Sequence, residues 1–191
     1  DFKMGRNLIM LGTAILVVSL LAIIIIGFLS GMSNPVPWIA LLILVVVVLL
    51  HNKLVKRNYL SWKDSYSVGI ESIDSDHKKL IHLINNLQTA IDYKTDKQFE
   101  QQTLAEVIDY TKYHFQREED IMEKNKYADF VSHKAQHEIM IEKVTTLARG
   151  YENDESGAIE ALLMYLKSWL INHINHTDQE YSGFLLSKGV K

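Results

Sequence analysis

The stretch HFQREEDIMEKNKYADFVSHKAQHEIM, residues 114–140, has the pattern of two helices joined by a turn. His114 and Glu118 are four residues apart, and so are His133 and His137. Residues at this spacing lie on one face of an α-helix, one turn apart. The segment NKYAD between the two pairs is polar and has the composition of a turn. The stretch therefore predicts a helical hairpin with paired polar groups on each helix.

Hydrophobic periodicity extends this hairpin to four helices. Apolar residues at helical intervals predict helices over about residues 76–91, 97–124, 129–149 and 156–187. Asp74 is the predicted N-cap of the first helix. The preceding segment SWKDSYSVGIES is predicted to be an irregular arm that packs Trp62 and Tyr66 on the bundle. Four long helices with short links predict an all-α, up-down-up-down bundle.

Two uncharged apolar runs, residues 8–29 and 32–50, precede this part of the chain. An apolar helix of about 20 residues spans the roughly 30 Å hydrocarbon core of a bilayer. A cleaved signal peptide is the alternative, but the first run is long for one and a second run follows at once. We therefore expect transmembrane helices over about 7–30 and 36–52, in a membrane anchor of residues 1–57 before a domain of residues 58–191.

Basic residues flank this predicted hairpin on its outer ends only. Lys3 and Arg6 precede the first run, and Lys53, Lys56 and Arg57 follow the second, while the connecting turn is uncharged. Positive charge marks the cytoplasmic side of a membrane protein. Both termini and the following domain are therefore predicted to be cytoplasmic.

The charge of the C-terminal part limits its partners. From residue 58 onward there are 22 carboxylates against 15 Lys and Arg, a difference of −7. Nucleic-acid binding requires a basic face, so we do not expect it. The chain has no cysteine, which excludes disulfides, thiolate metal ligands and thiol nucleophiles.

The inner stripes of the predicted helices carry polar residues where apolar ones are expected. They are His77 in the first helix, His114 and Glu118 in the second, His133 and His137 in the third, and His173 in the fourth. A single histidine on such a stripe is usually a hydrogen-bonded core residue, but a set drawn from all four helices is not. Burying an ionised glutamate costs several kcal/mol unless it is paired. Imidazole and carboxylate groups suit iron, zinc, copper or nickel, so we expect a buried metal site.

The number of ligands bears on the number of ions. Five histidines and two carboxylates, Glu118 and a second one near the end of the fourth helix, exceed what one ion normally takes. Two ions bridged by the carboxylates would use them all. The stretch WLINHINHTDQEY, residues 169–181, leaves the choice of its ligands open. In a regular helix His173 and His176 share a side, and Asp178 points about 140° away from His173.

Four segments together resemble the hemerythrin family, specifically the bacterial hemerythrins. They are IDSDHKKL (73–80), HFQREEDIMEKNKY (114–127), HKAQHEIM (133–140) and WLINHINHTD (169–178). The segments occur in the family's order, and the resemblance covers roughly residues 61–186. The predicted membrane hairpin lies outside it.

The resemblance implies two non-haem iron ions joined by an oxo or hydroxo bridge and by carboxylates. It implies that His133, His137 and His173 hold one iron, that His77 and His114 hold the other, and that Glu118 and Asp178 bridge them. Dioxygen would bind at the open position on the second iron. Candidate apolar walls for that pocket are Ile81, Phe115, Trp169, Leu170 and Ile174.

The choice of Asp178 over His176 requires an irregular fourth helix. An inserted residue, or π-bulge, brings residues five apart onto one side. We therefore expect a lengthened or i→i+5 backbone bond between about Ile171 and Asp178.

The resemblance favours a membrane-anchored protein of the bacterial inner membrane that binds dioxygen reversibly, for storage, delivery or sensing, without being an enzyme. Two alternatives remain open. One is a di-iron enzyme acting on peroxide, nitric oxide or nitrite, and the other is a sensor or accessory subunit of a membrane complex. Expected partners are dioxygen and the lipid bilayer, and candidates are a membrane oxidase or other membrane complex and a second copy of the chain through the transmembrane helices.

Overall fold

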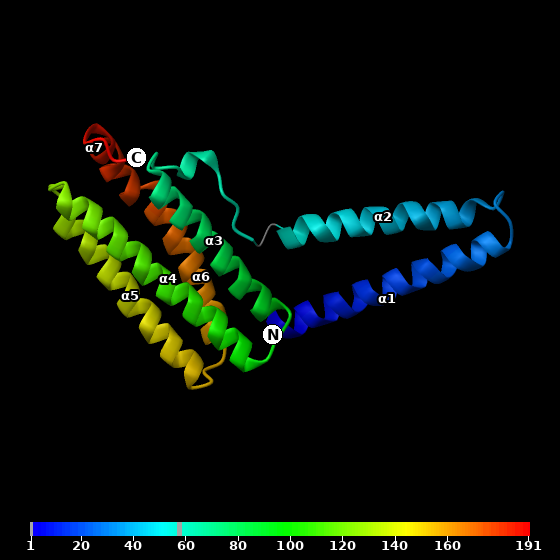
Figure 1. The fold of residues 1–191 in the computed structure, drawn as a ribbon. Helices are drawn as coiled ribbons and strands as arrows, with labels where there is room; N and C mark the ends of the chain where they lie inside the picture. Colours follow the sequence, from blue (N-terminus) through cyan, green and yellow to red (C-terminus); the bar gives the residue numbers. More distant parts are fainter. Residues whose placement is uncertain (1, 57–58) are drawn as a thin grey trace. The chain divides into compact units, whose positions relative to one another are not determined.

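The computed structural model describes the backbone of residues 2–56 and 59–191 and the side chains of residues 11–53 and 59–191. It is helical throughout, apart from turns and one irregular arm (Figure 1). The chain divides into two compact units, Asp1–Asn58 and Tyr59–Lys191. The predicted boundary between residues 57 and 58 falls on residues outside this description, as do the side chains of four of the predicted basic flanks, Lys3, Arg6, Lys56 and Arg57.

The first unit contains two long helices that pack against each other, α1 (Phe2–Leu29) and α2 (Pro35–Lys56). By length and composition, Leu11–Leu29 and Pro35–Lys53 could each cross a membrane. A Cβ atom at Gly27 would lie within 2.9–3.1 Å of the Pro37 ring, so glycine permits the close approach of the helices near their turn.

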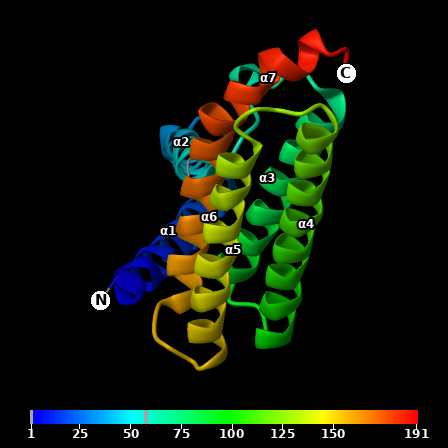
Figure 2. The same cartoon turned by 90° about the vertical axis from the view of Figure 1, so that its left-hand side faces the viewer.

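The second unit contains the 3-10 turn η1 (Asp64–Tyr66) and five helices. These are α3 (Glu71–Asp92), α4 (Lys97–Lys124), α5 (Phe130–Glu152), α6 (Ala158–Asn175) and α7 (Thr177–Ser187). Helices α3 to α6 lie side by side, and each packs on its neighbours in the cyclic order α3, α4, α5, α6 (Figures 1 and 2). The predicted all-α four-helix bundle, preceded by two apolar helices, is confirmed.

Helix α3 begins earlier than predicted, at Glu71 rather than near residue 76. Asp74 is therefore not an N-cap but lies in the first turn. Its carboxylate accepts a hydrogen bond from the backbone N–H of Val68 at 2.8 Å and another from the hydroxyl of Ser67. These bonds fix the arm that precedes the helix. As expected, that arm also packs on the bundle through Trp62 and the buried ring of Tyr66, whose centroids are 5.9 Å apart.

The interior of the bundle contains two separate apolar clusters. The larger one extends along most of the bundle and includes Leu80, Ile84, Leu87, Val107, Val144, Leu162 and Leu166. The smaller one, at the α7 end, consists of Val68, Ile70, Ile73, Met122, Tyr181 and Leu185. Along α3, α4 and α5, the buried histidines and carboxylates lie between residues of the two clusters. On α4, for example, His114 and Glu118 lie between Val107 and Met122.

Candidate metal centre

All seven predicted ligands are buried in one polar layer between the two apolar clusters. Their exposed fractions range from 0% to 5%. The bundle helices and α7 supply them: His77 from α3, His114 and Glu118 from α4, His133 and His137 from α5, His173 from α6, and Asp178 from α7. Antiparallel packing thus brings to one level residues that are up to 101 positions apart in the sequence.

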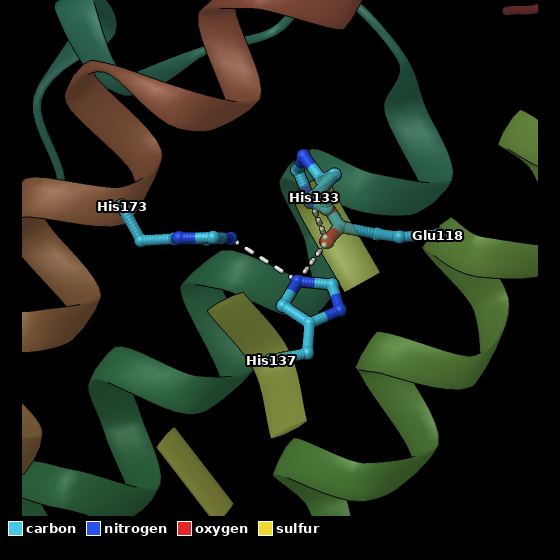
Figure 3. Close-up of side chains that lie close together, drawn as sticks. All are labelled: Glu118, His133, His137 and His173. Carbon is cyan, nitrogen blue, oxygen red and sulfur yellow. Dashed lines mark hydrogen bonds and ion pairs between the residues drawn. The ribbon is translucent and has the colours of Figure 1, made fainter. Parts of the chain in front are cut away.

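Six of these side chains form two groups that share Glu118. In one group, Glu118, His133, His137 and His173 offer ligand atoms within 4.8 Å of one another, and in the other His77, His114 and Glu118 do the same. Figure 3 shows the first group, with His133 and His137 directed at Glu118, and His173 at His137. The Nε2 atoms of His137 and His173 are 3.1 Å apart.

Glu118 presents a different oxygen to each group of histidines. Its Oε1 lies 3.8 Å from Nε2 of His77 and 3.7 Å from Nε2 of His114. Its Oε2 lies 3.7 Å from Nε2 of His133 and 3.4 Å from Nε2 of His137. Glu118 therefore faces both groups of histidines, with one oxygen toward each.

Asp178 lies between the same two groups. Its Oδ2 is 3.2 Å from Nε2 of His77, and its Oδ1 is 3.1 Å from Nε2 of His173 and 3.7 Å from Nε2 of His133. The structure therefore brings all seven predicted ligands together, with both carboxylates in the middle and the histidines on either side.

The hydrogen bonding of this layer is incomplete in a way that fits metal ions. Across the described residues, several buried atoms of the layer have no hydrogen-bond partner: both ring nitrogens of His77, Nδ1 of His114, Nε2 of His133, Oε2 of Glu118 and both carboxylate oxygens of Asp178. Leaving a buried polar atom unpaired costs about 1–3 kcal/mol. Neighbouring ring nitrogens and carboxylate oxygens of the layer lie 3.1–3.8 Å apart, close enough for adjacent atoms to share one ion. The residues present therefore fit bound metal.

Burial and mutual charge determine the protonation of the metal-free layer. Burial alone would raise the pKa of Glu118, but the surrounding histidines outweigh it and hold that pKa well below its ordinary value. Burial, reinforced by the charge on Glu118, raises the pKa of Asp178 to about 8. Burial lowers the pKa of His173 to about 2, and it also lowers the pKa of His77. Both imidazoles are therefore neutral at pH 7, the form that ligates metal.

The predicted fourth helix is in fact two helices, α6 and α7, and this is how Asp178 reaches the site. His176 separates them, with φ −122° and ψ −67°, and its N–H is shared between the carbonyls of Asn172 and His173. The predicted irregularity between residues 171 and 178 is present, but as a break at one residue and not as a π-bulge. His176 is exposed, while Asp178 is turned inward and is 0% exposed.

The five predicted wall residues are placed differently with respect to the two groups. Phe115 stacks on His137 with centroids 3.7 Å apart, and Trp169 stacks on His173 at 4.1 Å. These two rings therefore border the three-histidine group. Ile81, Leu170 and Ile174 are buried in the larger apolar cluster.

Three residues near the ligands were missed by sequence reasoning. Tyr181, which is 1% exposed, donates a hydrogen bond from its hydroxyl to Oε1 of Glu118. Glu119 and Asp76 are also buried, and each lies near the Nδ1 atom of a ligand histidine. The available signal was position: Asp76 and Glu119 are sequence neighbours of His77 and Glu118, and Tyr181 is one helical turn after Asp178.

A groove of about 400 Å³ runs between α4 and α5 beside the three-histidine group. Phe115, Glu119, Lys134 and His137 are among its lining residues. Solvent thus approaches the outer edge of a ligand imidazole from this side.

Comparison with known proteins agrees with this geometry. The family model described as the hemerythrin HHE cation binding domain matches residues 68–185. The bacteriohemerythrin of Stenotrophomonas maltophilia is 34% identical over 123 residues, 64% of this chain and 79% of that protein. A hemerythrin-like protein of Naegleria fowleri is 30% identical over 65% of this chain and 92% of its own length.

A solved structure is similar as well. The crystal structure of wild-type hemerythrin aligns with a TM-score of 0.61 and 28% identity, over 66% of this chain and 97% of that chain. The family model covers more than half of the chain and includes all seven candidate ligands. This chain therefore belongs to the hemerythrin family.

Proposed function

We propose that this protein binds dioxygen reversibly at a centre of two non-haem iron ions. The observation that carries the proposal is the two-sided placement of Glu118 and Asp178, each with one oxygen toward either group of histidines. Bridging anions also reduce the repulsion between two cations. The pair of ions, when bound, supplies the two electrons and the open coordination position that dioxygen requires.

The ligands divide unequally between the two ions. His133, His137 and His173 would hold one iron, and His77 and His114 would hold the other, with Glu118 and Asp178 placed between the two groups. The iron with two histidines has fewer protein ligands and is therefore the proposed dioxygen site.

The surroundings favour binding over further reaction, because reversible binding needs a site that does not donate protons. Tyr181 is the phenol nearest the ligands, and its proton is engaged by Oε1 of Glu118. Burial, with the charges of Glu118 and Asp178, raises its pKa well above the ordinary value, so the phenol keeps its proton. Ile81, Leu170 and Ile174 are buried in the larger apolar cluster and carry no side-chain proton donor.

The optical spectrum of the full chain in detergent tests this function. The reduced, iron-loaded protein should gain a ligand-to-metal charge-transfer band on exposure to dioxygen and lose it under argon over repeated cycles. A band that decays within seconds, or steady-state turnover of peroxide, nitric oxide or nitrite, would favour the enzyme and overturn the proposal.

Matched histidine variants test the division of ligands. His77→Ala and His114→Ala should abolish the band while iron remains on the three-histidine group. His176→Ala, which changes an exposed histidine, is the control and should keep the band. Normal dioxygen binding in His114→Ala would show that the open position has been assigned to the wrong ion.

We further propose that α1 and α2 anchor the domain to the bacterial inner membrane, with both termini cytoplasmic. Large apolar side chains along both helices are exposed, including Ile25 and Ile26 at 62% and 64% and Leu42 at 64%. A water-soluble surface rarely carries so large a continuous apolar patch, whereas a bilayer accommodates it. Dioxygen partitions into lipid, so such an anchor keeps the site near its ligand and near a membrane oxidase or other membrane complex as partner.

Membrane fractionation and chemical labelling test the anchor. The full chain should remain in the membrane pellet after a carbonate wash, and a cysteine introduced at exposed Met32 in the turn should react only from the periplasmic side. Release by carbonate would contradict the anchor, and labelling from the cytoplasm would contradict the topology. Cross-linking from the same cysteine would detect a dimer formed through the hairpins.

A further inference from the structure

Two buried carboxylates outside the seven ligands lie behind two of the ligand imidazoles. Oε1 of Glu119 accepts a hydrogen bond from Nδ1 of His137 at 3.0 Å. Oδ2 of Asp76 lies 3.6 Å from Nδ1 of His114. In both imidazoles the other nitrogen, Nε2, faces Glu118. Each ring is thus held between a carboxylate on its outer side and the ligand centre on its inner side.

The two pairs serve different groups of ligands and come from different parts of the bundle. His137 belongs to the three-histidine group, and its partner Glu119 reaches it from α4 to α5. His114 belongs to the two-histidine group, and its partner Asp76 reaches it from α3 to α4.

Each of the two carboxylates also contacts a cation at the surface. Oε2 of Glu119 is 3.1 Å from Nζ of Lys134, whose side chain is 45% exposed in the α4–α5 groove. Oδ2 of Asp76 is 3.1 Å from the guanidinium of Arg117, which is 32% exposed. The hydroxyl of Tyr110 also donates to Oδ1 of Asp76 at 2.7 Å. A chain of contacts therefore runs from each group of ligands to a solvent-exposed cation.

We propose that Glu119 and Asp76 are positioning residues, one for each metal ion, which hold His137 and His114 with Nδ1 protonated and Nε2 free to ligate. An ionised carboxylate can only accept, and each of the two rings has one on either side, so the nearer carboxylate decides which nitrogen carries the proton. Nδ1 of His137 is 3.0 Å from Glu119, whereas its Nε2 is 3.4 Å from Glu118. Nδ1 of His114 is 3.6 Å from Asp76, whereas its Nε2 is 3.7 Å from Glu118. The charge-assisted hydrogen bond between His137 and Glu119 fixes that ring and makes its Nε2 a stronger donor to metal. The 3.6 Å contact between His114 and Asp76 is longer than a hydrogen bond, so Asp76 orients that ring through its charge. The assignment of one carboxylate to each of two irons rests on the proposed function, but the orientation of the rings does not.

The metal-free protein tests the orientation by itself. Side-chain ¹⁵N spectra of the histidines in the full chain should show His137 with its proton on Nδ1. Glu119→Gln keeps an acceptor and should preserve this tautomer, whereas Glu119→Leu removes the acceptor and should shift the population toward Nε2–H. An unchanged tautomer in Glu119→Leu would overturn the role of Glu119. The same comparison of Asp76→Asn with Asp76→Leu tests His114.

Metal binding gives a second measure. Losing the partner of a ligand histidine typically lowers metal affinity by about 10- to 100-fold. Glu119→Leu should show a loss of this size, and Lys134→Met a smaller one, because its cation is one contact farther from the ring. Glu123→Gln changes an exposed carboxylate one turn farther along α4 and should match the unsubstituted protein. Equal affinities in Glu119→Leu and Glu123→Gln would contradict the proposal.

Mössbauer spectroscopy of the ⁵⁷Fe-loaded protein separates the two ions. Glu119→Gln should alter the quadrupole doublet of one iron, Asp76→Asn that of the other, and the double variant both. Changes in the same doublet, or in neither, would overturn the assignment of one carboxylate to each iron. A single iron in the unsubstituted protein would instead refute the proposed di-iron function, while the tautomer of His137 would still report on Glu119.

Discussion

The larger apolar cluster and the polar layer are built from the same four helices, yet they differ in whether the chain alone can satisfy them. Leu87, Val107 and Leu162 are each 0% exposed, and their side chains have no polar atom that would need a hydrogen bond. The polar layer is equally buried, but much of its hydrogen-bonding capacity is unused. The contrast indicates that the larger apolar cluster specifies the bundle. The polar layer lowers the stability of the metal-free bundle, but it supplies the ligands for metal.

Asp178→Asn should have the largest effect, because it should change metal binding and the stability of the metal-free protein in opposite directions. The amide cannot bridge two cations as a carboxylate does, so metal binding should fall by orders of magnitude. The metal-free protein should become more stable, because the raised pKa of Asp178 means that its charged form is disfavoured by folding. Iron content and urea unfolding of the metal-free protein measure the two effects. Wild-type iron content in this variant would remove Asp178 from the ligand set.

The gain in stability should depend on pH in a definite direction. The pKa of Asp178 is about 8 in the folded protein and 3.8 for an ordinary aspartate, so the folded state binds an extra proton between these limits. The wild type therefore loses stability as pH rises from about 4 to 8, by up to about 1.4 kcal/mol per pH unit. The difference between Asp178→Asn and wild type should grow over this range and vanish near pH 4. A difference independent of pH would contradict this account.

Leu162→Ala should affect stability and leave the polar layer alone. Removing a fully buried leucine side chain costs about 2.7–5 kcal/mol, depending on how far the cavity collapses. Because Leu162 is in the larger apolar cluster, the loss should be similar in the metal-free and iron-loaded proteins. Denaturant unfolding with and without metal measures it. A loss seen only with metal bound would mean that the two regions are not independent.

Tyr181→Phe tests the boundary between the polar layer and the smaller apolar cluster. The change keeps the ring in its cluster but removes the hydroxyl that donates to Glu118. We expect iron affinity to fall by about 10- to 100-fold, as when other partners of metal ligands are removed. Competition with a chelator measures the affinity, and Tyr127→Phe, a partly buried tyrosine of the same cluster, is the control. Equal affinities in both variants would mean that the hydroxyl does not support Glu118.

Sequence periodicity was sufficient for the bundle and for most of the site, and it failed where the chain departs from repetition. The limits of α4 match the predicted 97–124, because its apolar residues recur regularly from Leu104 to Met122. Asp74 was predicted to be an N-cap, but its carboxylate accepts a hydrogen bond from Val68 in the arm before the helix. Helical periodicity carries no information about a contact with an irregular segment. The pairing of Glu119 with His137 joins two helices, and contacts of that kind leave no regular spacing in a sequence.

The smallest effect is expected at His176, although helical arithmetic alone would have chosen it as a ligand. It is exposed at the break between α6 and α7, and its Nδ1–H donates only to the carbonyl of Asn172, at 2.9 Å. Substitutions at such positions usually change stability by less than about 0.5 kcal/mol. His176→Ala should therefore keep both iron content and unfolding midpoint, whereas His173→Ala, three residues earlier, should lose iron. If His176→Ala lost iron as His173→Ala does, the break would depend on His176 itself. The proposed cause, the inward turn of Asp178 toward His77 and His173, would then be wrong.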